Sequence, residues 1–232
     1  MYDHEFFVET TTGFTENLLS HYDLDEVLLD LAGRLIRLFS LAGSGVTLGR
    51  DGVLHAVMAV PSHLAPLEVY QEQEQEGPCA DAFRSGRTVA VTDLRLEERW
   101  PGYRRVAKEL GMRSVVGVPM RLADQSVGAL NMYHAETREW SDEDLDAARV
   151  LANMATGYLM NASSLAKQTQ LAHQLQQALD SRVVIEQAKG VLAEARGISV
   201  EAAFDRLRSH ARSHNSRVQH VATAVVSMGL RP

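Results

Sequence analysis

The chain has 232 residues, of which 45% are apolar and 23% charged, and it contains one cysteine. Such a composition is globular, with length for one large or two modest domains that can each bury a core. A lone Cys79 cannot close an intrachain disulfide, the first 30 residues lack the basic start and apolar run of a secretory signal, and no apolar run approaches the ~18 residues that span a bilayer. These features exclude a transmembrane protein, and we expect a cytoplasmic one that does not act at a membrane.

The charge divides the chain into two parts. Residues 1–167 carry 15 Lys and Arg against 25 Asp and Glu, a net charge of −10, whereas residues 168–232 carry 8 against 5, a net charge of +3. The acidic first part would repel phosphate, but the second part, which holds four of the nine histidines, would not. Two functions on one chain are therefore predicted.

Helices and short strands alternate through the first part. Leucines at 28, 31 and 35 recur with the period of an amphipathic helix, and the Asp-Gly pair at 51–52 suits a tight hairpin turn. The polar run 71–76 favours a solvated helix face. The predicted elements, in order, are a helix over 23–42, strands over 45–48 and 54–60, a helical or irregular stretch over 67–75, a short helix after Gly77, a strand over 88–92, a helix over 103–110, and hairpin strands over 114–121 and 126–134.

A long helix is predicted from Ser141 to about Arg196. Ser141 suits the N-cap, and the acids after it favour the first turn. No Pro or Gly interrupts the chain between Tyr158 and Ala188, so the helix links the two parts, chiefly over 141–182. Its apolar side chains step mostly by four and three residues, which is typical of a coiled-coil seam and predicts a homodimer. The seam positions are Leu151, Ala155, Tyr158, Ala162, Leu165, Leu171, Leu175 and Leu179.

Four segments of the first part resemble the GAF family of small-molecule sensor domains. They are EGPCADAF at 76–83, VTDL at 91–94, GMRSVVGVPM at 111–120 and VGALNM at 127–132. The resemblance implies a domain over 1–165 with a central antiparallel sheet, a helical layer made by its first and last helices, and a ligand pocket on the opposite face. No residue set selects among cyclic nucleotides, tetrapyrroles and haem, so the ligand and any cofactor stay unassigned.

Cys79 is a weak candidate for ligand binding. Near a helix start its thiol could have a lowered pKa and serve as a thioether attachment site or redox switch, or it could simply fill the core. A GAF-like methionine sulfoxide reductase needs more than one reactive cysteine. The chain has no P-loop, GxGxxG, HExxH or GxSxG motif. We predict no catalytic residue, no metal site and no enzymatic activity.

The last 65 residues are predicted to form three helices. The first ends at Gly197, the second begins at Ser199, and the third begins near Ser216. Together they make a small all-α bundle around one apolar core. The residues expected to face that core are Val184, Ala188, Val191, Leu192, Ala195, Ala203, Phe204, Leu207, Ala211, Val218, Val221, Ala222 and Val225.

These helices resemble the ANTAR family of RNA-binding modules. The match is carried by RVVIEQAKGVL at 182–192 and GISVEAAF at 197–204, and it covers most of a predicted domain over 168–232. Leu192 is followed by Ala-Glu, where many members carry Met or Leu-Met. The resemblance implies recognition of paired stem-loops in nascent transcripts and transcription antitermination. The expected fold class is α+β: a GAF-like antiparallel sheet with helices, a coiled-coil-like helix, and a three-helix ANTAR bundle.

A protein that reads RNA hairpins needs cations for phosphate and polar groups for loop bases. Gly190 in mid-helix costs about 1 kcal/mol relative to Ala, which indicates a close approach to its backbone, by RNA or by a neighbouring helix. Arg208 and Arg212 share a helix face, which could also be a solvated basic stripe. The candidate RNA-binding residues are Lys189, Gly190, Arg208, Arg212, His214, Asn215 and Arg217.

The sequence thus predicts a dimeric antitermination regulator whose GAF-like domain senses a small-molecule or redox signal and controls binding to tandem RNA hairpins. Two alternatives stay open. A DNA-binding regulator is disfavoured because Val200, Glu201 and Ala202 stand where a recognition helix would read bases. A non-enzymatic dimeric interaction protein would not need the cations around Lys189.

Overall fold

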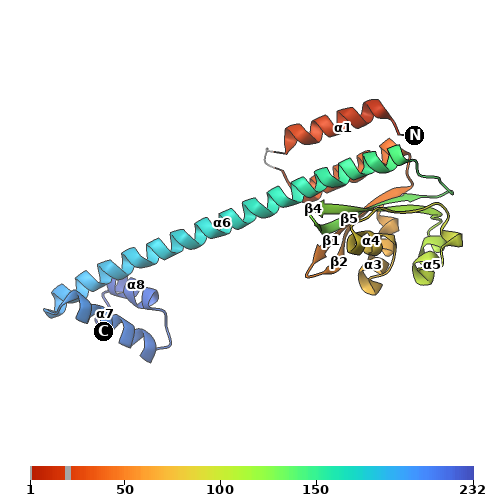
Figure 1. The fold of residues 1–232 in the computed structure, drawn as a ribbon. Helices are drawn as coiled ribbons and strands as arrows, with labels where there is room; N and C mark the ends of the chain where they lie inside the picture. Colours follow the sequence, from red (N-terminus) through yellow and green to blue (C-terminus); the bar gives the residue numbers. More distant parts are fainter. Residues whose placement is uncertain (1, 19–21) are drawn as a thin grey trace. The chain divides into compact units, whose positions relative to one another are not determined.

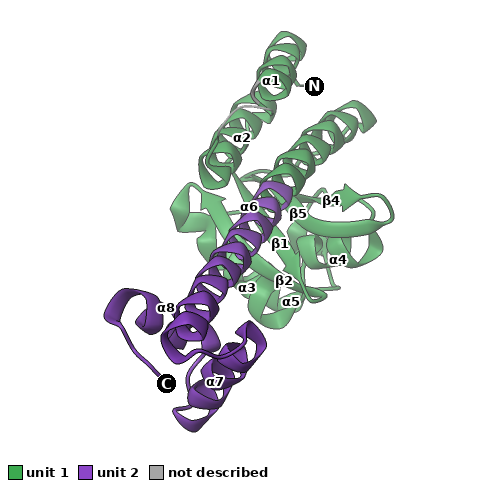
Figure 2. Ribbon diagram, turned by 90° about the vertical axis from the view of Figure 1, so that its left-hand side faces the viewer, with its two compact units in different colours: residues 1–163 green, residues 164–232 purple. Residues whose placement is uncertain are grey.

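The computed structural model describes residues 2–18 and 22–232, so residues 1 and 19–21 of the predicted domain 1–165 lie outside the described residues. The chain separates into two compact units, residues 1–163 (unit 1) and 164–232 (unit 2), which Figure 2 shows in different colours. The elements are α1 (His4–Asn17), α2 (Leu24–Phe39), β1 (Gly43–Arg50), β2 (Val53–Val60), η1 (Ser62–Leu64), α3 (Ala65–Glu74), α4 (Pro78–Ser85), β3 (Val89–Val91), η2 (Leu94–Leu96), α5 (Pro101–Glu109), β4 (Ser114–Leu122), β5 (Gln125–His134), α6 (Asp142–Arg196), α7 (Val200–Ser213) and α8 (Val218–Met228).

Unit 1 is built on a five-stranded antiparallel sheet with strand order β2-β1-β5-β4-β3. Both predicted hairpins are present as β1–β2 and β4–β5. Asp51 and Gly52 have φ values of 53° and 80°, the left-handed values that a two-residue hairpin turn requires. The long central strands β5 and β1 bring residues from distant parts of the sequence onto one face, as the pairing of Gly45 with Asn131 illustrates.

Helices cover both faces of the sheet, which gives the three layers visible in Figure 1. One face packs against α2 and the beginning of α6, on which α1 lies, and the other against α3, α4 and α5. This agrees with the expected fold class, an α+β protein with a central antiparallel sheet. The first core contains Phe14, Leu28, Leu35, Val116, Val118, Leu130, Met132, Leu151 and Tyr158, and the second contains Leu64, Leu67, Trp100, Tyr103, Val115 and Tyr133.

The helix α1 was not predicted from the sequence. Three threonines in a row and Gly13 are poor helix formers, and they hide the pattern. The signal lies in Phe6, Thr10 and Phe14, which are four residues apart and all buried, and in Asp3, whose side chain accepts a hydrogen bond from the Phe6 N–H at 3.0 Å. The helix covers part of the first core.

Part of the predicted coiled-coil seam is occupied within the chain itself. Leu151, Ala155 and Tyr158 are each no more than 1% exposed because they pack in the first core of unit 1. The prediction that they mediate self-association is therefore wrong, since a helix that packs on a sheet also needs an apolar face with helical spacing. The later seam positions Leu165, Leu171, Leu175 and Leu179 are exposed.

Unit 2 contains the C-terminal part of α6 together with α7 and α8, as predicted. Its core consists of Ala188, Leu192, Ala203, Leu207, Ala211, Val221, Ala222 and Val225. Gly197 ends α6 with a φ of 60°, and the Ser199 hydroxyl caps α7 by accepting from the Ala202 N–H at 3.1 Å. Two residues expected inside this core differ: Ala195 is exposed, and Phe204 is only half-buried. Among the described residues, no helix is long and apolar enough to cross a membrane.

Candidate functional site

Two predicted RNA-binding cations lie around one aromatic ring in unit 2. The Lys189 Nζ is 5.5 Å from the centre of the Phe204 ring, and the Arg208 Cζ is 5.7 Å from the same centre. Lys189 comes from α6, whereas Phe204 and Arg208 are one turn apart on α7, so the packing of α7 on α6 creates the group. A half-buried ring between two cations offers a stacking surface next to positive charge, which is how proteins hold unpaired bases.

Gly190 lies in open space beside Lys189. It is exposed, and a Cβ atom built on it would meet no heavy atom within 4 Å among the described residues. The alternative that a neighbouring helix requires a glycine here is therefore not supported within the chain. The helix backbone at this position is free to be approached by another molecule.

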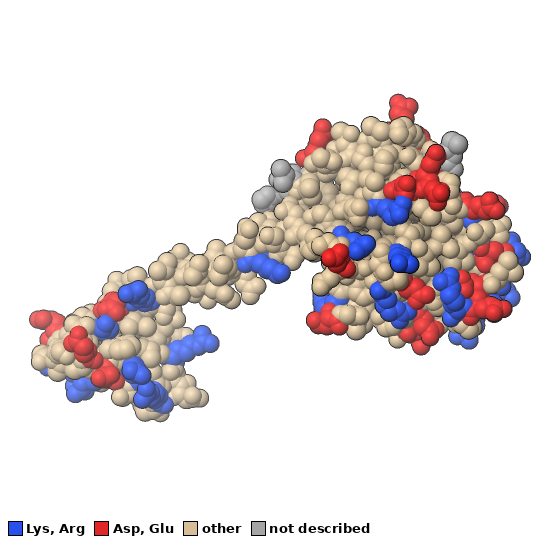
Figure 3. All heavy atoms as spheres, in the orientation of Figure 1, with Lys and Arg blue, Asp and Glu red and all other residues tan. Residues whose placement is uncertain are grey.

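The remaining predicted residues surround the C-terminal end of α7. Arg212 follows Arg208 by one helical turn and is exposed. The His214 Nδ1 donates to the His210 carbonyl oxygen at 2.9 Å, and the two imidazole rings stack with their centres 4.0 Å apart. Asn215 has a φ of 48°, and Arg217 occupies the N-cap of α8. These exposed polar groups extend the basic surface of unit 2. Figure 3 shows some of the Lys and Arg side chains of this unit.

Acidic residues moderate this basic surface. Both carboxylate oxygens of Glu186 accept from the Lys189 Nζ at 2.8 Å, and the Lys189 side chain is 17% exposed. The backbone N–H of Glu201 itself, the Ser199 side chain and the charge of Lys189 lower the pKa of the Glu201 carboxyl. A phosphate that binds Lys189 must therefore compete with Glu186, a contact that the sequence reasoning did not include.

Unit 1 contains a second candidate centre, a cluster of buried polar side chains under α3. Glu68 is 1% exposed and accepts hydrogen bonds from the Tyr133 hydroxyl at 2.5 Å and from the Asn131 Nδ2 at 2.7 Å. Burial raises the pKa of Glu68 to about 7. The hydrogen bonds from Tyr133 and Asn131 lower the pKa, but by less than burial raises it. The prediction of a fully solvated face over 71–76 is wrong for Gln71, which is buried and accepts from the Cys79 N–H at 2.8 Å.

Two polar atoms of this cluster have no hydrogen-bond partner in the described part of the chain. They are the Gln71 Nε2 and the Asn131 Oδ1. Buried polar groups without partners are rare, and they point to a bound water or small polar ligand. Neither this cluster nor Glu68 was predicted, because a single Glu in a polar helical stretch gives no sign that its side chain points inward.

Cys79 belongs to the same region and is completely buried. The Thr47 hydroxyl donates to its Sγ at 3.5 Å. Burial raises the pKa of the thiol, which is the opposite of the shift expected for a reactive cysteine at a helix start. Cys79 packs against Leu54, Ala80 and Ala129 in a small apolar cluster of unit 1.

Comparison with known proteins identifies both units. The family model of the GAF domain matches residues 23–159, and that of the ANTAR domain matches residues 173–226. No curated protein matches the chain. A GAF domain from an Acinetobacter phosphoenolpyruvate-protein phosphotransferase is 15% identical, with a TM-score of 0.54 over 69% of this chain and 97% of that one. Free methionine-R-sulfoxide reductase from Neisseria meningitidis is 16% identical, with a TM-score of 0.53 over 68% of this chain and 91% of that one. At these identities the likeness concerns the fold alone.

Proposed function

The chain belongs to the GAF family, and from this premise we propose that it binds paired RNA hairpins as a homodimer. An ANTAR domain follows its GAF domain. This combination indicates a non-enzymatic, RNA-binding antitermination regulator with a small-molecule-sensing domain. The observation that carries the proposal is the group of Lys189, Phe204 and Arg208 beside the open backbone at Gly190. It supplies phosphate-binding charge and a stacking surface at one place, which is what a hairpin loop requires.

Binding of the full chain to three nucleic acids of equal length tests this function. A paired-hairpin RNA, a single hairpin and a duplex DNA are titrated at 50 and 200 mM salt, with light scattering to measure the oligomeric state. We expect a dimer to prefer the paired hairpin over both others. Preference for the duplex would favour a DNA-binding regulator, and equally weak, salt-sensitive binding to all three would favour an interaction protein.

An exposed apolar stripe on α6 supports the dimer. Leu171, Leu175, Leu179 and Val183 are 56–59% exposed and follow each other at four-residue steps, with Leu165 on the same side of the helix. A contiguous exposed apolar stripe is typical of an interaction surface, and burying one leucine completely stabilises a protein by about 1.5–3 kcal/mol. A second copy of the chain offers the same stripe, so two copies can cover each other.

Negative charge introduced on this stripe should separate dimerisation from RNA contact. We expect L175E/L179E to be monomeric in light scattering and to bind the paired hairpin no better than a single hairpin, a loss of about 10²-fold through the missing second module. The control Q170E/Q177E adds the same charge to exposed positions on the other side of the helix and should remain dimeric. A dimeric L175E/L179E variant would show that the stripe is not the interface.

Gly190→Ala should have opposite effects on stability and on RNA binding. It should stabilise α6 by about 1 kcal/mol, because Ala is the better helix former and its methyl group meets nothing in the chain. It should weaken binding to the paired hairpin, because the methyl group occupies the space that RNA approaches. Gly157→Ala is the matched control, since Gly157 lies in the same helix with equally open surroundings, and it should leave RNA affinity unchanged. Equal RNA affinity of both variants would remove Gly190 from the site.

The sensing step is assigned to unit 1. The buried cluster of Glu68, Asn131 and Tyr133 supports a small polar ligand there, because the Gln71 Nε2 and the Asn131 Oδ1 have no partner among the described residues. A ligand that binds one arrangement of the dimer better than another would change RNA affinity without touching the RNA. The affinity for the paired hairpin, measured at increasing concentrations of candidate polar metabolites, tests this coupling. In the Glu68→Gln variant we expect the hairpin affinity not to respond to the metabolite.

A further inference from the structure

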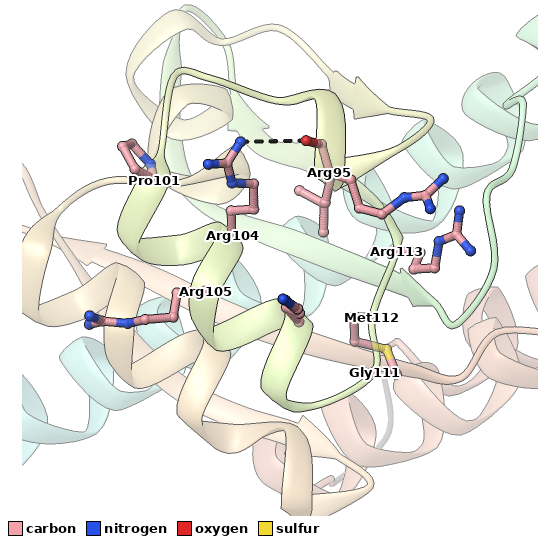
Figure 4. Close-up of a pocket in the computed structure, with 9 residues that line it drawn as sticks. Arg95, Pro101, Arg104, Arg105, Gly111, Met112 and Arg113 are labelled. Carbon is pink, nitrogen blue, oxygen red and sulfur yellow. Dashed lines mark hydrogen bonds between the residues drawn. The ribbon is translucent and has the colours of Figure 1, made fainter.

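Unit 1 has a basic pocket outside the buried cluster of Glu68. It is a cavity of about 660 Å³ lined by parts of η2 and α5 and by residues 111–113 just before β4, and Figure 4 shows its lining residues. Five of the 14 Lys and Arg residues of 1–163 line this one cavity, although that part of the chain is acidic overall. The five are Arg95, Arg104, Arg105, Lys108 and Arg113.

The fold holds these cations together in a fixed arrangement. Tyr103 and Ala107 anchor α5 in the core, and Arg104, Arg105 and Lys108 are the residues of α5 that line the cavity. The Arg104 Nη1 donates to the Arg95 carbonyl at 3.4 Å and the Glu97 carbonyl at 3.2 Å, which fixes η2 against α5. The dashed line in Figure 4 marks the first of these bonds.

The positive charge of the pocket is only partly compensated. Asp93 accepts from the Arg95 Nη2 at 2.6 Å and the Arg113 Nη2 at 3.5 Å. Arg105 and Lys108 make no ion pair with any described residue. The Arg113 Nε is buried and has no hydrogen-bond partner in the part of the chain that the structure describes. The five cations thus lie close together with one carboxylate, Asp93, between them, and the buried Arg113 Nε is an unused donor. This arrangement indicates a site for an anion.

We propose that this pocket binds a small molecule that carries two or more phosphate groups and a flat apolar part, the chemical class of nucleoside di- and triphosphates. Guanidinium groups match phosphate oxygens in two-point contacts, and several of them match a chain of phosphates better than one. The volume lies in the range of small-molecule pockets and exceeds the need of a single phosphate. Leu94, Pro101 and Met112 line the same cavity and provide apolar contact.

The inference goes beyond the proposed function, since none of the pocket's residues belongs to the Glu68 cluster or to the RNA-binding set. Calorimetric titration of the full chain with ATP, inorganic triphosphate and adenosine tests it. We expect ATP and triphosphate to bind and adenosine alone not to bind. The variant R105A/K108A should weaken ATP binding about tenfold or more through two lost charged contacts.

The control variant R50A/R87A removes the same charge from exposed arginines that do not line the pocket, and should stay within twofold of the native affinity. All four replaced residues are exposed, so we expect both variants to fold, which thermal melts would check. Equal ATP affinity of the two variants, or adenosine binding as tightly as ATP, would overturn the proposal. So would a loss of hairpin RNA affinity in R105A/K108A without any ATP binding to the native chain, because the anion would then be RNA.

Discussion

Lys189→Ala and Arg208→Ala should each weaken binding to the paired-hairpin RNA by about tenfold or more, as expected when a direct nucleic-acid contact worth 1–3 kcal/mol is removed. Both cations lie within 6 Å of the Phe204 ring, so each loss changes the same surface. Filter binding or fluorescence anisotropy at several salt concentrations measures the affinity, and the slope of log K against log salt should fall by about 1 for each cation that contacts phosphate.

Arg206→Ala is the matched control for Arg208→Ala. Arg206 is an exposed arginine on α7, two residues before Arg208 and therefore on another side of the helix. It changes the net charge by the same amount, so an effect of long-range charge alone would appear in both variants. If Arg206→Ala and Arg208→Ala weaken RNA binding equally, the group around Phe204 is not the contact surface.

Glu68→Gln should change how the stability of unit 1 depends on pH. The pKa of Glu68 is about 7 in the folded protein, against 4.5 for an exposed carboxyl, so the folded state holds this proton more tightly than the unfolded state. The tighter proton binding contributes fully to the free energy of unfolding below pH 4.5. This contribution decreases as the pH rises and is lost above about pH 7, which amounts to about 3 kcal/mol in total. The neutral amide of Gln has no such dependence, so Glu68→Gln should gain stability relative to the native chain between pH 5 and 8.

Urea unfolding at pH 5 and pH 8 measures this difference. The two tryptophans, Trp100 and Trp140, both lie in unit 1, so their fluorescence reports the unfolding of that unit. Glu74→Gln provides the control, because Glu74 is on the same helix but exposed. If the free energy of unfolding of Glu68→Gln follows the native pH dependence, Glu68 is ionised throughout, and the ligand hypothesis for its cluster would need a cation.

Much of the fold follows from local sequence signals. The Asp-Gly turn at 51–52, the N-cap at Ser199 and the glycine at 197 each fix one chain reversal or helix end through short-range chemistry, and the structure has all three. The helix α1 was missed because its evidence is tertiary: Phe6 and Phe14 are explained only by the core they enter.

The candidate sites were harder to predict, for a related reason. Lys189 and Arg208 could be proposed as cations, but their position around Phe204 depends on how α7 packs on α6. Glu68 gave no signal, because the direction of one side chain in a polar helix depends on the register of α3 against β1 and β5. Leu151 illustrates the reverse error, since a helical apolar spacing does not distinguish a dimer interface from a surface buried within the chain.

The buried thiol of Cys79 has a practical consequence. It is the only cysteine in the sequence, it is fully buried at the start of α4, and its raised pKa keeps it protonated. An alkylating reagent can therefore react only when this part of unit 1 opens, and the rate of labelling measures the frequency of that opening. The labelling rate of Cys79, measured by mass spectrometry, therefore reports local unfolding without an introduced probe. A compound that binds unit 1 would lower this labelling rate.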